Sequence, residues 1–188
     1  MPSDLTAITS RVLADPSTLD PFTSSGDLQV VIETPRNSRN KYAYDHERHV
    51  LVLKKVLPTG MLFPFDFGFV PSTLAEDGDP IDVLVLMDEP TVPGVLLEAR
   101  LIGVIEGEDV LEGGKTQRND RLLAIATVSE TYEQINDVSQ LPEKMVESIK
   151  QFFATYPRLL AGKVYTVLAC KGPAEARKLV EEAHRNAS

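Results

Sequence analysis

The sequence has only one cysteine and no long apolar run, and each of these excludes a class of protein. With Cys170 as its one cysteine, the chain cannot form an internal disulfide. No stretch approaches the roughly 18 consecutive apolar residues of a membrane-spanning helix, and the first residues lack the apolar core of a signal peptide. We therefore expect a cytoplasmic protein that does not bind membranes.

Basic residues are also scarce. Nineteen Lys and Arg stand against 28 Asp and Glu, which gives a formal net charge of −9. Nucleic acids and anionic membranes attract excess Lys and Arg, so the composition argues against both partners. The 188 residues suffice for one domain with a sizeable core. Scattered Pro, Ser and Thr suggest an N-terminal extension over residues 1–26, ahead of a single domain over 27–188.

Short apolar runs rich in Val, Leu and Ile recur after residue 26 and are broken by Pro, Gly or polar clusters, as strands are. These runs cover residues 28–33, 50–57, 83–87, 95–105, 122–128 and 164–169. Pro142 precedes apolar residues at helical spacing up to Phe153, and Pro173 opens a second helical pattern. Many strands followed by two helices predict an α+β fold, with helices packed outside an antiparallel or mixed β-barrel.

Charge is unevenly spread along the chain. Residues 36–55 contain six basic residues and two acids, whereas residues 76–89 contain six acids and no base. If the fold brings these stretches together, they can bind a metal and an anion side by side. Two solvated surfaces of opposite sign are the alternative, and charge counts do not distinguish the two. Residues 107–119 form a polar, Gly-containing connection, of a kind that is often functional or mobile.

Residues 77–82 (DGDPID) carry the most specific pattern, with Asp77, Asp79 and Asp82 directly before an apolar run. Carboxylates this close repel one another unless a cation lies between them, and oxygen ligands suit Mg²⁺ rather than zinc. Asp-Gly and Asp-Pro pairs are also typical of turns, but a turn needs only one Asp. An unpaired Asp82 at the start of a buried strand would be costly. The spacing therefore favours a magnesium site, and with it phosphate chemistry.

Other groups have plain structural interpretations. Lys54 and Lys55 end a predicted strand and read as exposed lysines, and the aromatic cluster over residues 63–69 (FPFDFGF) is expected to pack in the core. No zinc spacing links the three histidines, which are expected at the surface: His46, His49 and His184. Ser and Cys nucleophile motifs and a Gly-x-x-x-x-Gly-Lys phosphate loop are all missing from the sequence.

Together, these segments resemble the soluble family I inorganic pyrophosphatases. The family signature Asp-small-Asp-Pro-apolar-Asp-apolar is matched by residues 77–83 (DGDPIDV). Further matches follow in the family's order over residues 28–157, and so many are not expected by chance. They are VVIE (30–33), KY (41–42), FPFDFGF (63–69), VLVL (83–86), LIGVIEGED (101–109), YEQINDVSQLP (132–142) and QFFATY (151–156).

The resemblance implies a five-stranded OB-like closed β-barrel with two main α-helices packed outside. It also implies hydrolysis of pyrophosphate with several Mg²⁺ ions, in a homo-oligomer. Asp77, Asp82 and Asp109 match metal ligands of the family, and Glu33 matches an acidic site position counted with them. Asp79 matches the carboxylate that takes a proton from the metal-bridging water.

The resemblance also implies four substrate-binding residues: Lys41, Lys55, Arg121 and Tyr156. Two of them depart from the family, since Lys55 replaces an arginine and Arg121 aligns with a lysine. Lys keeps the charge of Arg but loses its planar two-point grip. The alignment of Arg121 leaves Asn119 at a metal-aspartate position, so Asn119 is counted with the expected ligands. Whether the neighbouring Asp120 substitutes for the missing carboxylate stays open.

Further departures bear on activity. Ala43 stands where the family has a metal-holding glutamate, and Phe67 stands where a tyrosine hydroxyl contacts phosphate. Pro157 replaces a phosphate-contacting lysine, for which Arg158 could substitute. An insertion over roughly residues 110–118 lengthens the connection beside the site and brings two more bases.

Three functions follow. The first is Mg²⁺-dependent hydrolysis of pyrophosphate to two orthophosphates by metal-activated water. Because of Ala43, Phe67 and Asn119, the second is a divergent pyrophosphatase-like protein with weak activity or another phosphoanhydride substrate. The third is a non-catalytic OB-type binding module, since OB folds bind single strands through basic grooves and aromatic platforms. The acidic composition argues against this third function.

Overall fold

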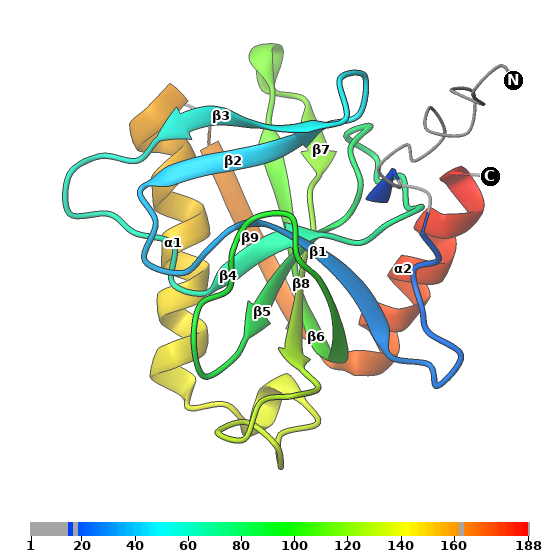
Figure 1. Cartoon of the computed structure of the whole chain (residues 1–188). Coiled ribbons are helices and arrows are strands. Elements are labelled where there is room, and N and C mark those ends of the chain that lie inside the picture. Colours follow the sequence, from blue (N-terminus) through cyan, green and yellow to red (C-terminus); the bar gives the residue numbers. More distant parts are fainter. Residues whose placement is uncertain (1–14, 17–18, 162–163, 188) are drawn as a thin grey trace, which may run out of the picture.

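The computed structural model describes residues 15–16, 19–161 and 164–187, in which all strands but one precede the two long helices, and the last strand separates the helices along the chain (Figure 1). The elements follow in the order β1 (Leu28–Thr34), β2 (Asn40–Asp45), β3 (Val50–Val56), β4 (Asp66–Phe69), β5 (Asp82–Leu86), β6 (Leu96–Val110), η3 (Glu112–Gly114), β7 (Thr116–Arg118), β8 (Arg121–Ala126), η4 (Val138–Gln140), α1 (Glu143–Ala161), β9 (Val164–Lys171) and α2 (Pro173–Ala187). Within this described part, no helix has both the length and the apolar content needed to cross a bilayer.

The main sheet is organised around the long strand β6. This strand pairs with β1, β7, β8 and β9, and β8 continues through β5 to β4. Strand β1 pairs with β4 as well as with β6. All of these pairings are antiparallel except that of β5 with β8, which is parallel. The mixed α+β fold predicted from the sequence is therefore confirmed, and the strand expected over 95–105 extends to Val110.

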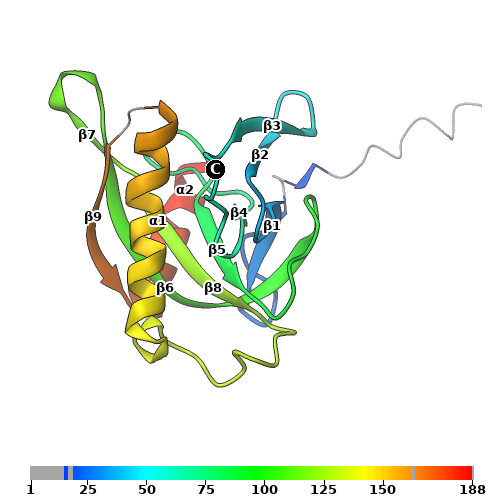
Figure 2. The ribbon, with the colours of Figure 1, turned by 90° about the vertical axis from the view of Figure 1, so that its left-hand side faces the viewer.

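Both faces of the central strands are buried, because successive side chains alternate between two apolar clusters. In β5, Leu84 and Leu86 join the cluster that α1 covers, whereas Val83 and Val85 join the cluster that α2 covers. Figure 2 shows α1 in front of the sheet and α2 behind it. Strands covered on both sides read as continuous apolar runs, which is why β5 and β8 could be recognised from the sequence. Each fully buried Leu or Val side chain contributes about 1.5–3 kcal/mol to the stability of the folded protein.

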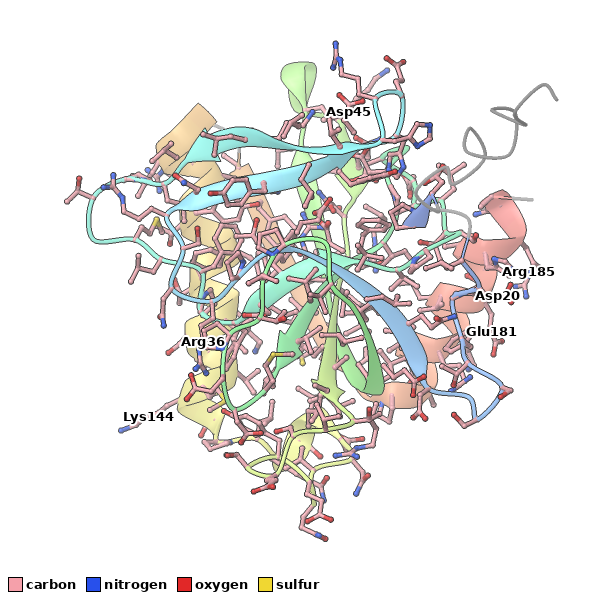
Figure 3. The ribbon with its side chains drawn as sticks, in the orientation of Figure 1. Asp20, Arg36, Asp45, Lys144, Glu181 and Arg185 are labelled. Carbon is pink, nitrogen blue, oxygen red and sulfur yellow. The ribbon has the colours of Figure 1, made fainter. Side chains whose placement is uncertain are left out.

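The two predicted helices are confirmed. Pro142 directly precedes α1, and its carbonyl accepts the N–H of Met145 at 2.9 Å. The buried face of α1 consists of Ile149, Phe152, Phe153 and Tyr156, and the buried face of α2 consists of Ala176, Val180 and Ala183. On the opposite side of α2, Glu181 and Arg185 point away from the sheet (Figure 3). Each helix therefore covers the sheet with one apolar stripe, as the spacing predicted.

Strands β2 and β3 form a separate two-stranded hairpin across one end of the main sheet (Figure 1). At its turn, the Asp45 carboxylate accepts the N–H groups of Glu47 (3.1 Å) and Arg48 (2.9 Å), and Figure 3 shows Asp45 at this tip. The sequence predicted β3 but not β2, whose side chains are all half-buried. Strand β4 was also unpredicted, although its aromatic residues do pack in the core, with Phe67 fully buried.

The predicted N-terminal extension, residues 1–26, lies partly outside the described residues. In its described part, Phe22 forms a β-bridge with Leu28, and its ring centroid lies 4.5 Å from the guanidinium of Arg177 in α2. Arg177 also donates to the carbonyl of Gly26 at 2.7 Å. The segment just before β1 therefore packs against α2, and the domain boundary at residue 26 stays a prediction.

Candidate active site

A cleft of about 420 Å³ lies between the β2–β3 hairpin, the loop before β5 and the chain between β6 and β8. All ten residues that the sequence assigned to the site line this cleft: Glu33, Lys41, Lys55, Asp77, Asp79, Asp82, Asp109, Asn119, Arg121 and Tyr156. The basic stretch and the acidic stretch thus meet in one place, which is the arrangement required for binding a metal and an anion side by side. The roles of the ten residues remain proposals.

The loop before β5 holds its carboxylates by a tight turn. Gly78 has a φ of 89°, which glycine adopts without steric cost, and its N–H donates to the carbonyl of Ala75 at 3.1 Å. The N–H of Ala75 in turn donates to the carbonyl of Asp79 at 2.9 Å, and the N–H of Asp79 donates to the Asp77 carboxylate at 3.2 Å. The predicted turn is therefore present, and it presents the carboxylates to the cleft, while metal binding by them stays a prediction.

Burial, and then the neighbouring acidic groups, perturb Glu33. Its side chain is buried, and burial raises its pKa to about 7 despite a 2.6 Å hydrogen bond from the N–H of Tyr44, with Asp82 adding to the rise. Burial also raises the pKa of Asp77, and the charges of Asp82 and Asp79 act in the same direction. Carboxylates in such a setting resist ionisation until a cation enters.

The donor chemistry of the cleft fits a hard divalent cation. Five carboxylates line it, and oxygen ligands are those that Mg²⁺ prefers: Glu33, Asp77, Asp79, Asp82 and Asp109. In the part of the chain that the structure describes, no three His, Cys, Asp or Glu side chains converge closely enough to hold an ion. Arg121 and Asn119 account for part of this separation, because they lie between the carboxylates of Asp82 and Asp109.

Lys41 approaches the cleft from the hairpin. Its Nζ lies 5.1 Å from the ring centroid of Phe67 and 5.8 Å from that of Tyr156, whose hydroxyl is 3.4 Å away. Burial alone lowers the pKa of Lys41, but the surrounding charges, led by Tyr156 and Asp82, outweigh burial and raise the pKa above its ordinary value. Lys41 therefore stays cationic, and Lys55 lies opposite it in the hairpin register.

Arg121 is a buried cation at the first position of β8. Its Nη1 lies 2.6 Å from Oδ2 of Asp82, the residue opposite it in the parallel pairing of β5 with β8. Burial alone lowers the pKa of Arg121, whereas Asp82 raises it, and the balance is a raised pKa. The guanidinium is therefore a permanent positive charge among the carboxylates.

The polar, Gly-containing connection over residues 107–119 forms a β-hairpin. Strand β6 runs to Val110 and pairs with β7, which brings Leu111 and Gln117 into the cleft lining. Of the two bases that the insertion adds, Lys115 is exposed and lies outside the lining. The other, Arg118, forms an ion pair with Asp120 at 2.8 Å. The insertion therefore shapes the cleft without adding a cation to it.

Two substitutions left open by the sequence do not occur. Asp120 lies outside the cleft lining, because its carboxylate accepts the N–H of Gly107 at 3.0 Å and pairs with Arg118. It therefore does not replace the carboxylate missing at Asn119. Pro157 lies within α1 and lines the cleft, but the neighbouring Arg158 is exposed and lies outside the lining. Arg158 therefore does not supply the missing lysine.

Sequence reasoning missed other lining residues. Tyr165 in β9 is 4% exposed, its hydroxyl donates to the carbonyl of Asn119 at 3.0 Å, and burial raises its pKa to about 12. Gly107 is the sequence signal for it, since a Cβ there would collide with the Tyr165 ring. His46 is exposed, as the sequence predicted, but it also lines the cleft, with its ring 5.0 Å from that of Tyr44.

Known proteins are similar to this chain in both sequence and fold. The family described as inorganic pyrophosphatase matches residues 30–188. The chain is 40% identical over 157 residues to the inorganic pyrophosphatase of Leifsonia xyli subsp. xyli, covering 84% of this chain and 93% of that protein. It is 35% identical over 177 residues to the inorganic pyrophosphatase of Synechocystis sp., covering 94% and 97%. The crystal structure of inorganic pyrophosphatase from Thermus thermophilus aligns with a TM-score of 0.85 and 34% identity, covering 93% of this chain and 99% of that one. As the sequence resemblance predicted, the chain belongs to the inorganic pyrophosphatase family.

Proposed function

We propose that the protein hydrolyses inorganic pyrophosphate to two orthophosphates with Mg²⁺ as its cofactor. The observation that carries the proposal is one cleft where carboxylates of the main sheet and of the loop before β5 meet lysines of the β2–β3 hairpin, with Arg121 among the carboxylates. A protein with a net charge of −9 would repel a polyanion without a compensating positive charge in the site. When bound, divalent ions supply that charge and lower the pKa of a coordinated water.

The carboxylates of Asp77, Asp82, Asp109 and Glu33 would hold the metal ions. Their oxygen chemistry supports this role, and so does the raised pKa of Glu33, which comes first from burial and then from the neighbouring charge of Asp82. Asn119, also predicted as a ligand, offers a neutral amide oxygen that Arg121 already engages.

Asp79 would act as the general base. Its backbone is tied into the turn by its N–H and its carbonyl, so the carboxylate projects into the cleft from a fixed point. A base in this position takes the proton from the attacking water as the water adds to phosphorus. Such proton transfers typically contribute about 10²–10⁴ to a rate.

The cations would bind the substrate. Lys41 and Arg121 are held against aromatic rings, while Lys55 is exposed and reaches in from β3. Positive charge near the leaving phosphate meets the main electrostatic need of phosphoryl transfer. Tyr156, whose hydroxyl lies beside Lys41, would contact a phosphate oxygen.

The finer architecture belongs to the same proposal. Strand β1 pairs with both β4 and β6, which supports a closed five-stranded OB-like barrel formed by β1, β4, β5, β8 and β6. A single domain over residues 27–188, assembly into a homo-oligomer and a cytoplasmic location are carried over from the sequence. Light scattering coupled to size-exclusion chromatography measures the assembly.

The two alternative functions call for different residues in the cleft. A divergent enzyme with weak activity or another phosphoanhydride substrate is supported by Ala43, which lines the cleft without a carboxylate, and by the buried Phe67. A non-catalytic module that binds single strands needs a basic groove. Five carboxylates in the lining oppose such binding.

A phosphate-release assay with pyrophosphate, ATP and a sugar diphosphate, with Mg²⁺ or with EDTA, separates the three functions. We expect fast release from pyrophosphate, much slower release from the other two substrates and almost none in EDTA. Faster release from ATP or the sugar diphosphate would favour the divergent enzyme. No release from any of them would favour the binding module.

A further inference from the structure

The strand register places Arg121 among the acidic groups. Asp82 is the first residue of β5, and Arg121, the first residue of β8, is its partner in the parallel pairing. Asp82 lies two residues before Leu84 in β5, and Arg121 lies two residues before Leu123 in β8. Both therefore belong to the face of the sheet that α1 covers, because side chains two residues apart on a strand share a face. The ion pair between Nη1 and Oδ2 of Asp82, at 2.6 Å, is therefore fixed by the backbone of the main sheet.

Asn119 connects this ion pair to a second carboxylate. Its Nδ2 donates to Oδ2 of Asp109 at 2.8 Å, and its Oδ1 accepts from Nη1 of Arg121. An aspartate at this position could accept from Arg121 but could not donate to Asp109. The neutral amide thus completes a chain of hydrogen bonds that runs from Asp82 through Arg121 and Asn119 to Asp109. The guanidinium of Arg121 supplies the positive charge in this chain.

Aromatic groups keep the guanidinium in place. Its Cζ lies 5.6 Å from the ring centroid of Phe153 and 5.7 Å from that of Tyr165, and both rings are buried. The Tyr165 hydroxyl donates to the carbonyl of Asn119, which ties the same ring to the same turn. The Nε of Arg121 is buried without a hydrogen-bond partner among the described residues, so the charge is largely removed from water. A charge in such a setting acts strongly on its neighbours.

We propose that Arg121, positioned by Asn119, takes the place of one divalent cation between Asp82 and Asp109. This inference rests on the proposed function, since it concerns how the same cleft balances its charge. An aspartate at position 119 would give three carboxylates around this position and call for one more divalent ion. Asparagine removes that demand, and one guanidinium nitrogen of Arg121, Nη1, contacts both Asp82 and Asn119. The site therefore carries a built-in cation and takes up one fewer Mg²⁺ per chain.

The direct test is Asn119→Asp, titrated with MgCl₂ alone by isothermal calorimetry at fixed ionic strength. We expect one more Mg²⁺ bound per chain than in the wild type. The matched control, Asn136→Asp, adds the same charge at an exposed position outside the cleft lining, and its uptake should equal that of the wild type. Equal stoichiometry and affinity in Asn119→Asp and the wild type would overturn the inference.

A second variant, Arg121→Gln, protects the test against a folding defect in the first. Removing the guanidinium leaves Asp82 and Asp109 without their cation, so Mg²⁺ uptake should tighten by at least about tenfold, as expected for one unit charge at close range. Near-ultraviolet circular dichroism checks that the variant is folded, and unchanged affinity in the folded variant would overturn the inference. A wild type that binds no Mg²⁺ would instead contradict the proposed function, so the two failures are distinguishable.

Discussion

The two walls of the cleft are built differently. The acidic wall belongs to the main sheet: Asp82 opens β5 and Asp109 lies near the end of β6, and both strands run through the buried core. The basic wall belongs to the β2–β3 hairpin, where Leu53 is 55% exposed and Val56 is 48% exposed. Groups that hold a metal need fixed directions, whereas long lysine side chains reach a substrate from a peripheral element. The buried core therefore holds the acidic side of the cleft, whereas the basic side lies on a more exposed element.

Lys41 is the exception on the basic wall. It belongs to the hairpin but lies against the rings of Phe67 and Tyr156, a residue of α1, and both rings belong to the core cluster that α1 covers. Lys54 and Lys55, in β3, are exposed. Within one hairpin, therefore, one lysine is held by the core and two are not, and substitutions can separate their contributions.

The largest effect is expected on the acidic wall, from Asp79→Asn. The amide cannot accept the proton of the attacking water, so turnover should fall by about 10² or more while the fold is kept. Phosphate release from pyrophosphate measures turnover, and thermal melting checks the fold. Asp120→Asn is the matched control, because Asp120 lies outside the cleft lining and its amide oxygen can still accept from Gly107. An unchanged rate in Asp79→Asn would remove it from the mechanism.

The pH dependence of stability tests the same wall without its metal. Glu33 has a pKa of about 7 in the folded protein, against 4.5 for an ordinary glutamate. Between these values the folded protein holds a proton that the unfolded chain has lost, so stability falls as pH rises through this window and levels off above about 7. The loss from this one group is about 3 kcal/mol.

Glu33→Gln should remove that loss, since the amide oxygen can accept from Tyr44 and carries no charge. Urea unfolding in EDTA at pH 4.5 and pH 8 measures the free energy of unfolding of both proteins. The wild type should lose more stability between the two values than the variant does. Glu47→Gln, in the exposed turn of the hairpin, should behave as the wild type. The prediction fails if Glu33→Gln loses as much stability as the wild type.

On the basic wall, Lys41→Met should lower kcat/KM by about tenfold to a hundredfold, the range for one hydrogen bond to a charged group. Methionine preserves the packing against Phe67 and Tyr156 and removes only the charge. Lys54→Met removes an exposed charge from the same hairpin and should cost about twofold, because solvent screens it. Equal losses in the two variants would show that the aromatic setting of Lys41 is irrelevant.

The smallest expected effect is a gain in affinity for pyrophosphate. Lys55→Arg restores the planar group that grips two phosphate oxygens, so KM for pyrophosphate should fall by about threefold. Steady-state kinetics at saturating Mg²⁺ measure it, with kcat nearly unchanged. A rise in KM would mean that the cleft has adapted to the shorter reach of lysine.

The sequence predicted those elements and site residues that depend on a short stretch of neighbouring residues. Strands β5 and β8 are buried on both faces, so their apolar runs were visible, whereas the half-buried β2 and the short β7 gave no pattern. The carboxylates of the 77–82 loop followed from their spacing, and the remaining site residues followed from the resemblance. The pairing of Arg121 with Asp82 could not be predicted, because it depends on the register between two strands almost forty residues apart. Tyr165 was missed for the same reason, since only the pairing of β9 with β6 brings it to the site.

The most direct test of the central claim is a calorimetric titration of the metal-free wild type with Mg²⁺, alone and with a non-hydrolysable pyrophosphate analogue. If the acidic wall is a metal site that recruits pyrophosphate, uptake will saturate and will be tighter when the analogue is present. No saturable uptake under either condition would contradict the account.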